Sequence, residues 1–167
     1  NRNHEVTAIS RTAKDSDKDN LKYVAVDVLN IQELAETLKG NDAVVNAYNS
    51  GWTNPNIYDD FIAGSKAILE AVKKSGVTRF ITIGGAGSLF VAPNLQAVDT
   101  PDFPKEIYPG ASAARDFLNL IKEEKELDWA FFSPAFEMHQ GITIGRTGKY
   151  RLGLENPVFD ENQRSIL

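Results

Sequence analysis

Short apolar runs alternate along this chain with segments whose apolar positions recur at helical spacing. The runs predict strands at Glu5–Arg11, Leu21–Val28, Asp42–Tyr48, Arg79–Ile83 and Trp129–Phe132, with shorter extended pieces at Gly148–Leu154 and Asn156–Leu167. Because strands and helices alternate, the pattern predicts an α/β fold with a Rossmann-like, doubly wound parallel sheet. The continuous apolar run Phe80–Ile83 is typical of a strand buried on both faces.

The intervening segments carry helix signals. Asn30 and Glu33 resemble a capping box, and Gly40 ends the helix that follows. Asn54-Pro55 opens the next helix, and the last covers Ala111–Lys125. We expect one face of each helix to be buried: Ile31, Leu34, Ala35 and Leu38; Phe61, Ser65, Ile68, Leu69 and Val72; Ala113, Ala114, Phe117, Leu118 and Ile121. The long, proline-containing connection Leu89–Tyr108 is typical of a functional loop.

The segment Thr78–Ser88 indicates where a ligand binds. An apolar strand ends in Gly84-Gly85-Ala86-Gly87 and the hydroxyl of Ser88. Parallel α/β sheets bind ligands at the carboxyl edge of their strands, and small residues there let a flat ligand approach the main chain closely. This segment therefore predicts a nucleotide or dinucleotide site.

A dinucleotide-binding domain normally begins with a central strand, a glycine-rich loop and a helix. This sequence starts at Asn1-Arg2-Asn3-His4, which is similar to the end of that first helix. We expect one domain, residues 1–167, preceded in the functional polypeptide by a strand-loop-helix unit of about 20–25 residues. Ser165-Ile166-Leu167 likewise reads as the start of a strand, so we expect further residues there too.

Composition narrows the functional classes. With 167 residues and 42% hydrophobic content, the chain is able to form one core. A formal charge of −5 argues against nucleic acid or an anionic membrane as the main partner, and no apolar run approaches the roughly 20 residues that span a bilayer. The chain has no cysteine, which fits a cytoplasmic protein, and its two histidines, His4 and His139, are too far apart in sequence to suggest a metal site.

Several segments together resemble the atypical short-chain dehydrogenase/reductases, in particular the NADH-flavin reductase group related to NmrA-like proteins. The likeness spans nearly the whole chain. It is carried by Asn3–Arg11, Val26–Val28, Leu38–Val45, Gly51–Pro55, Gly84–Leu89, Phe132–Ala135 and Arg146–Arg151. The resemblance implies an NAD(P) cofactor and a small-molecule substrate, and it leaves a homodimer open.

The fold and the resemblance together give the expected cofactor residues: Ser10, Arg11, Asp27, Val28, Ala47, Tyr48, Asn49, Gly84, Gly85, Ala86, Pro134 and Ala135. Arg11 follows the strand that reaches the adenosine ribose, where a carboxylate favours NAD and a cation favours the 2′-phosphate of NADP. We therefore expect NADP(H) in preference to NAD(H). Asp27 is interpreted as an adenine contact or an ordinary turn aspartate, and Tyr48 as a ribose neighbour or a half-buried aromatic.

The acceptor side is expected to be apolar and aromatic. Trp52 is placed either over the nicotinamide or against its own loop, and Phe136 and Met138 either form an acceptor wall or belong to the core. A cationic ribbon with Tyr150 among its residues is a candidate for binding an anionic acceptor: Arg146, Lys149, Tyr150 and Arg151.

Tyr108 is the candidate catalytic residue. The resembling superfamily uses Tyr-x-x-x-Lys, in which the lysine lowers the pKa of the tyrosine; here the lysine position is Ser112. Arg115 is a candidate substitute, although it lies almost a turn further on. Ser88 is interpreted as a helix cap rather than a catalytic hydroxyl. Without the lysine, a phenol is a poor acid–base group at neutral pH, which disfavours carbonyl reduction.

Hydride transfer to a conjugated ring needs no dedicated acid, because the ring delocalises the arriving charge. The residues therefore favour an NAD(P)H-dependent reductase of a flat acceptor, with FMN or FAD ahead of quinones. The alternative is a non-catalytic NADP-binding sensor of NmrA type. An isomerase or epimerase ranks last, because it needs the tyrosine–lysine pair.

Overall fold

The computed structural model describes residues 3–12, 14–139, 141–143 and 147–166. Its elements follow one another as β1 Val6–Ser10, β2 Leu21–Ala25, α1 Ile31–Leu38, β3 Ala43–Asn46, α2 Ile57–Ser75, β4 Arg79–Ile83, β5 Phe90–Ala92, β6 Leu95–Gln96, α3 Tyr108–Ile121 and β7 Asp128–Phe132. The pair β1–β2 and the sheet β3–β4–β7 are parallel, and β5–β6 is a small antiparallel hairpin. The mixed α/β architecture with parallel strands confirms the expected fold class.

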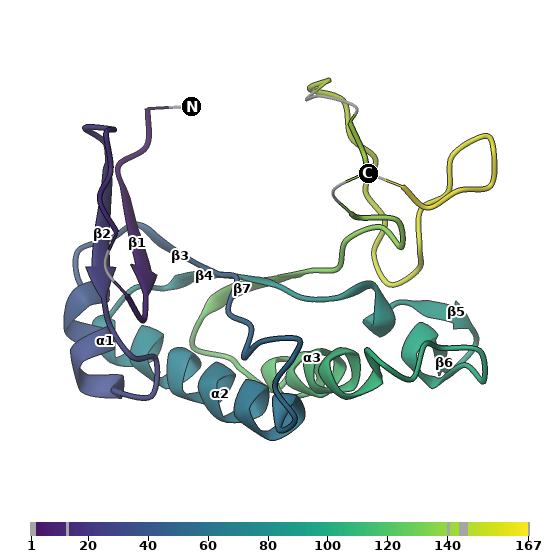
Figure 1. Cartoon of the computed structure of the whole chain (residues 1–167), viewed down its shortest axis with the longest axis horizontal. Helices are drawn as coiled ribbons and strands as arrows, with labels where there is room; N and C mark the ends of the chain where they lie inside the picture. Colours follow the sequence, from purple (N-terminus) through teal and green to yellow (C-terminus); the bar gives the residue numbers. More distant parts are fainter. Residues whose placement is uncertain (1–2, 13, 140, 144–146, 167) are drawn as a thin grey trace.

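The helices α1, α2 and α3 lie on the same face of the strands (Figure 1). The core between them contains Phe80 of β4, Val72 of α2 and Phe117 of α3, each almost fully buried. The expected inward faces are buried in all three helices, with only Ile31 and Leu118 partly exposed at their margins. Hydrophobic burial along these faces is therefore what attaches the helices to the sheet.

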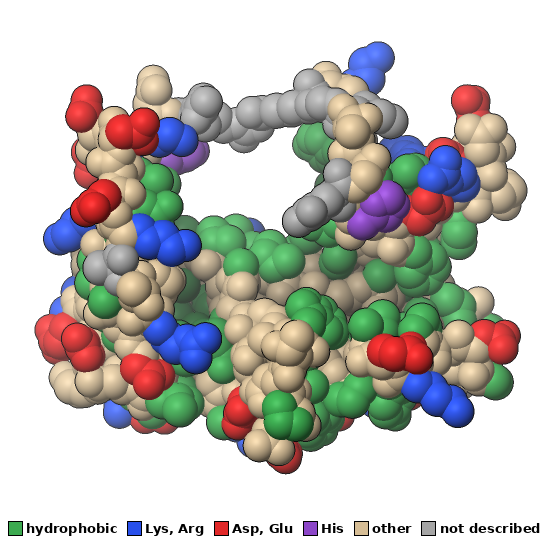
Figure 2. Space-filling view, viewed as in Figure 1, with side chains coloured by type: hydrophobic (Ala, Val, Ile, Leu, Met, Phe, Trp, Pro, Cys, Tyr) green, Lys and Arg blue, Asp and Glu red, His purple; other side chains and the backbone are tan. Residues whose placement is uncertain are grey.

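Burial alternates along β4, which differs from the expected burial on both faces. Phe80 and Thr82 point into the helical layer and are buried, whereas Ile81 and Ile83 are only half-buried. On the same open face, Val45 of β3 is 63% exposed. Figure 2 shows hydrophobic side chains gathered above the sheet, between the β1–β2 pair and the C-terminal segment. One face of the parallel sheet is thus apolar and uncovered in the described part of the chain.

Two strand edges face this open region. Among the described residues, β1 pairs with β2 alone and β3 pairs with β4 alone, although β1 and β3 are both central by position in a Rossmann-like order. Figure 1 shows β1 and β2 standing apart from β3, β4 and β7, with α1 below the β1–β2 pair and α2 extending from there below the centre. In the described part of the chain, β1 and β3 therefore each have one edge without a pairing strand.

The helix signals hold in detail, with some shifted boundaries. Asn30 Oδ1 accepts a hydrogen bond from the Glu33 amide at 3.4 Å, and Asn30 Nδ2 donates to Glu33 Oε2 at 2.7 Å, so the capping box is present. Helix α3 begins at Tyr108 rather than Ala111, because Pro109 fits a first helical turn. It ends at Ile121 rather than Lys125.

The polar connection between β1 and β2 is exposed at every described position from Arg11 to Asn20. The connection after β4 is more ordered than a loop, since it contains the β5–β6 hairpin and the short 3₁₀ turns Ala86–Ser88 and Ala97–Asp99. Beyond β7 no strand is assigned in the described residues, and an isolated bridge joins Glu137 to Ile166. The extended pieces expected at 148–154 and 156–167 are therefore not strands where they are described.

Candidate functional site

The carboxyl ends of the parallel strands collect the residues that the sequence suggested for cofactor binding. Arg11 follows β1, Asp27 lies just beyond β2, Tyr48 follows β3 and Gly84 follows β4. Pro134 and Ala135 are half-buried just beyond β7. Because the pairings β1–β2, β3–β4 and β4–β7 are parallel, these positions share one edge within each of the two sheets.

Charged residues after β1 and β2, together with Asp60 of α2, influence the pKa of Tyr48. Burial raises the pKa of the Tyr48 phenol, the carboxylate of Asp60 adds to this shift, Arg11 opposes it, and Asp27 reinforces it. Arg11 is exposed, and neither Ser10 nor Arg11 offers a carboxylate at this position.

The side chains of Tyr48, Asp27 and Ser10 each form hydrogen bonds with residues near them in the sequence or in the fold. The Tyr48 ring stacks on Phe61 at a centroid distance of 6.0 Å and fills the space beside Gly64, while its hydroxyl donates to the Asp60 carbonyl at 3.2 Å. The Asp27 carboxylate accepts from the Leu29 amide at 3.0 Å. The Ser10 hydroxyl donates to the Thr12 carbonyl at 2.6 Å. Tyr48 is thus a half-buried aromatic, as one of the two interpretations has it.

A buried polar pair under the same edge was missed by sequence reasoning. Asn46, the last residue of β3, donates from Nδ2 to Thr82 Oγ1 at 3.1 Å, and its Oδ1 accepts from the Tyr48 amide at 2.9 Å. The pair fixes the direction in which the chain leaves β3, through Ala47 and Asn49, which are both exposed. An asparagine ending the apolar run Ala43–Val45 was the available signal, because a polar residue there must find a partner.

The two glycines after β4 have different surroundings. A Cβ atom added to Gly84 would lie 1.9 Å from the ring of Phe131, so Gly84 is required by packing against β7. A Cβ added to Gly85 would meet no other atom within 4 Å. Gly85 has φ −136° and ψ 152°, an extended conformation open to any residue. Neither packing against other residues nor the backbone conformation therefore requires a glycine at position 85.

Ser88 does not cap a helix, contrary to the sequence interpretation. It is the last residue of the 3₁₀ turn Ala86–Ser88, is 5% exposed, and its hydroxyl donates to the Gly85 carbonyl at 2.8 Å. The same oxygen lies 2.9 Å from Ser133 Oγ, just beyond β7. Because the Ser88 proton is committed to Gly85, Ser133 is the donor of the pair. The two hydroxyls join the ends of β4 and β7.

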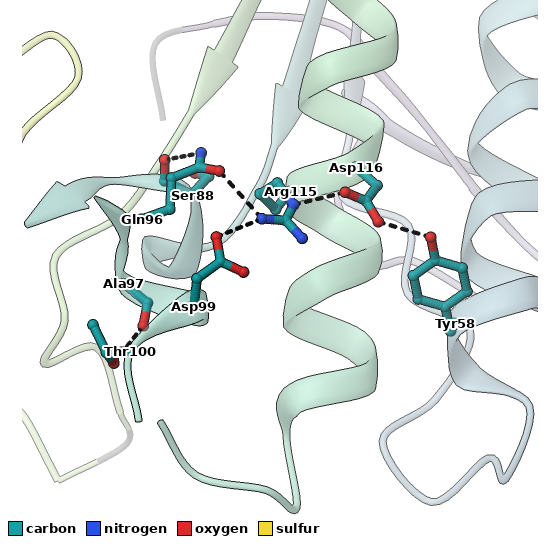
Figure 3. Close-up of polar contacts among 8 residues, drawn as sticks. All are labelled: Tyr58, Ser88, Gln96, Ala97, Asp99, Thr100, Arg115 and Asp116. Carbon is teal, nitrogen blue, oxygen red and sulfur yellow. Dashed lines mark hydrogen bonds and ion pairs between the residues drawn. The ribbon is translucent and has the colours of Figure 1, made fainter. Parts of the chain in front are cut away.

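Arg115 does not take the place of the lysine in the tyrosine–lysine pair. Its guanidinium donates to Asp116 at 2.6 Å, to Asp99 at 2.7 Å and to Gln96 Oε1 at 3.3 Å (Figure 3). Burial lowers the pKa of Arg115, but the hydrogen bonds and charges of Asp116 and Asp99 outweigh it, so the pKa is raised overall. The arginine is committed to these partners and remains charged.

Tyr108 lines a cleft of about 360 Å³, whose other lining residues lie between Val98 and Pro109. The phenol is 44% exposed, and the ring packs edge-on against Phe103 at 6.4 Å. Ser112, at the lysine position, donates to the Pro109 carbonyl at 3.1 Å. The larger cleft, about 440 Å³, lies between α2 and Glu124, away from the strand ends; charged surface side chains line it, so we assign it no role.

Trp52 reaches the start of α3 rather than packing only within its own loop. A Cβ added to Gly110 would lie 2.8 Å from the indole ring, yet the tryptophan is 61% exposed overall. Trp52 and the first turn of α3, which begins with Tyr108, therefore lie side by side. Trp52 thus contacts α3 at Gly110, whereas the Tyr108 ring packs against Phe103.

The remaining candidates lie after β7. Phe136 and Met138 are both largely exposed, and the Phe136 amide donates to Ser165 Oγ at 3.4 Å. Lys149, Tyr150 and Arg151 are exposed, and Arg146 lies outside the described residues. Val28 packs against the helical core, and Ala86 is half-buried in the 3₁₀ turn. Phe136 and Met138 are thus surface residues rather than core.

No helix in the described part of the chain is long and apolar enough to cross a membrane.

Comparison with known proteins identifies the family. A family model described as NAD(P)H-binding matches residues 1–165. The protein YwnB of Bacillus subtilis (strain 168) is 35% identical over 168 residues, covering 99% of this chain and 76% of YwnB.

Solved structures agree. A "putative epimerase" from Bacteroides thetaiotaomicron is 42% identical with a TM-score of 0.85, covering 98% of this chain and 73% of that one. A "putative NADH-flavin reductase" from Streptococcus pneumoniae TIGR4 is 32% identical with a TM-score of 0.79, covering 99% and 76%. A "putative exported protein" from Burkholderia pseudomallei is 36% identical with a TM-score of 0.83, covering 99% and 76%. With its parallel Rossmann-like strands and the match over nearly its whole length, this chain belongs to the NAD(P)H-binding family.

Proposed function

We propose that the protein is an NAD(P)H-dependent reductase that passes a hydride to a flat conjugated acceptor, with flavin as the leading candidate and quinone as the next. The observation that carries this proposal is the open main chain at Gly85, at the carboxyl end of β4. A flat ring is able to lie directly on such a backbone. The similarity to a protein described as an NADH-flavin reductase supports the same choice.

The surrounding residues suit this chemistry better than carbonyl reduction. NAD(P)H supplies a hydride, and a flavin or quinone ring delocalises the arriving charge, so that solvent is able to provide the proton. Tyr108 has Ser112 where a lysine would lower its pKa, and Arg115 is held by carboxylates. Catalysis would then come from holding two rings face to face, with Trp52 as a wall of the acceptor site.

Purified full-length protein tests this proposal. We expect NADPH oxidation with FMN, FAD or a quinone, together with saturable NADPH binding in a titration. Tight binding without turnover on any of these acceptors would favour the alternative, a non-catalytic NADP-binding sensor. That alternative rests on the same absent tyrosine–lysine pair. Absence of NADPH and NADH binding would contradict both functions.

We further propose a preference for NADP(H), on the basis of the exposed Arg11 at the end of β1. Replacing Arg11 with alanine is expected to weaken NADPH binding by about ten- to a hundredfold, because a charge-assisted hydrogen bond is worth about 1.5–3 kcal/mol. NADH binding should stay unchanged, since NADH lacks the 2′-phosphate. Parallel titrations with both cofactors measure the effect, with Lys14→Ala as the control for charge alone. Equal losses for both cofactors would contradict the assignment.

The two free strand edges support the expectation of an additional strand-loop-helix unit. A parallel strand between β1 and β3 would join the two groups into one sheet, and its helix would cover the open face at Val45. The loop between them would bring the glycine-rich phosphate site to the same edge as Arg11 and Gly85. An intact mass of folded, NADPH-binding protein equal to 18.4 kDa would contradict this proposal. A cytoplasmic location and a homodimer stay predictions.

A further inference from the structure

A continuous chain of polar contacts runs from the carboxyl ends of β4 and β7 to the start of α2. The buried amide of Gln96 donates to the Ser88 carbonyl at 2.7 Å, and its oxygen accepts from Arg115. Ser88 in turn joins Gly85 and Ser133 through its hydroxyl. At the other end, Asp116 accepts from the Tyr58 hydroxyl at 2.7 Å (Figure 3).

We propose that Gln96 and Arg115 are positioning residues for the nicotinamide part of the cofactor site, acting through Ser88 on the Gly85 main chain. This inference rests on the proposed function. It assigns a role to the connection after β4, whose length the strand order alone does not explain.

Gln96 connects the Ser88 carbonyl to Arg115 through its side-chain amide. It is 8% exposed, and both halves of its amide are used: the nitrogen holds the turn at Ser88, and the oxygen is held by Arg115. A buried amide with both halves paired is costly to disturb, because each group that loses its partner stays desolvated. The carbonyl of Ser88 is thereby fixed relative to α3.

Arg115 supplies the rigid end of this link. Its side chain is 16% exposed and makes contacts with two carboxylates, Asp99 on the 3₁₀ turn after β6 and Asp116 on α3 itself. A planar guanidinium is able to serve several acceptors in a fixed geometry, which an ammonium group does not reproduce. The turn Ala97–Asp99 and helix α3 are therefore locked to each other beside Ser88.

The series of polar contacts ends at the main chain of Gly85. Ser88 and Gly85 are joined across a single 3₁₀ turn, and the Ser133 hydroxyl ties this turn to the end of β7. A shift of the Ser88 carbonyl would therefore move Gly85, where a ring is expected to lie. The adenosine end of the site, near Arg11, lies on other strands and shares none of these contacts.

The test compares two ligands on full-length protein: NADPH, and 2′,5′-ADP, which carries the adenosine end without the nicotinamide. The variant Gln96→Glu keeps the size and the acceptor for Arg115, but places a carboxylate oxygen against the Ser88 carbonyl. We expect NADPH affinity to fall by at least about tenfold, with 2′,5′-ADP affinity unchanged. The control Tyr58→Phe breaks only the outer contact with Asp116 and should leave both affinities as in the wild type.

If Gln96→Glu does not fold, Arg115→Lys decides the matter, because it retains a cation beside Asp99 and Asp116 and loses the contact with Gln96. Melting temperatures of all variants accompany the titrations. Equal losses for both ligands, no loss for either, or the same loss in Tyr58→Phe would overturn the inference. Wild-type protein that binds neither ligand would instead contradict the proposed function.

Discussion

Replacing Gly85 with alanine is expected to lower NADPH affinity by about ten- to a hundredfold while leaving the melting temperature unchanged. The added methyl group meets no protein atom within 4 Å, and the backbone conformation of Gly85 is an ordinary extended one. The only atoms it would displace are those of a ligand on the main chain, and overpacking of this kind costs about 1–3 kcal/mol. A titration with NADPH, paired with thermal unfolding, measures both effects.

Gly76→Ala is the matched control. Gly76 ends α2 with φ +82° and lies before β4, at the opposite end of the strand from Gly85. Alanine there is strained and should cost about 1 kcal/mol of stability, with no change in NADPH affinity. An unchanged affinity in Gly85→Ala would mean that no ring approaches this backbone, and the proposed function would lose its main support.

Gly84→Ala should behave in the opposite way and destabilise the fold. Its Cβ would lie 1.9 Å from the Phe131 ring, so the ring or the ends of β4 and β7 must move. Overpacking at such a contact costs about 1–3 kcal/mol of unfolding free energy. Denaturant unfolding of Gly84→Ala against the wild type measures the loss.

A double-mutant cycle identifies the cause of that loss. Phe131→Leu removes the ring tip, so the double variant Gly84→Ala/Phe131→Leu should be more stable than the sum of the single effects predicts. Strict additivity would show that the ring of Phe131 is not what excludes a side chain at position 84.

The sequence predicted elements best where a local signal and burial agreed. β4 spans Arg79–Ile83 as expected, and α1 lies between a capping box at Asn30 and Gly40. Both are defined by residues within one or two turns of each other. The start of α3 was placed too late, although Pro109 after Tyr108 is a recognised signal for a first helical turn.

The periodicity of apolar positions does not predict contacts between residues that are far apart in the sequence. From the sequence, Arg115 is expected to be a cation on the helix surface. The spacing of residues does not indicate that it forms an ion pair with Asp99, 16 residues earlier. The same holds for Ser88 and Ser133, which are 45 residues apart. The small residues at Gly84 and Gly85 marked the correct place, but only the position of Phe131 separates the packing glycine from the open one.

The exposed polar connection between β1 and β2 has a practical consequence for a chain that contains no cysteine. A thiol introduced by Asp17→Cys would be unique among these 167 residues and would be accessible to a maleimide dye. Loop tips of this kind tolerate such additions well. Ligand occupancy then becomes readable by fluorescence from one labelled position, independently of absorbance by pyridine nucleotides or flavins.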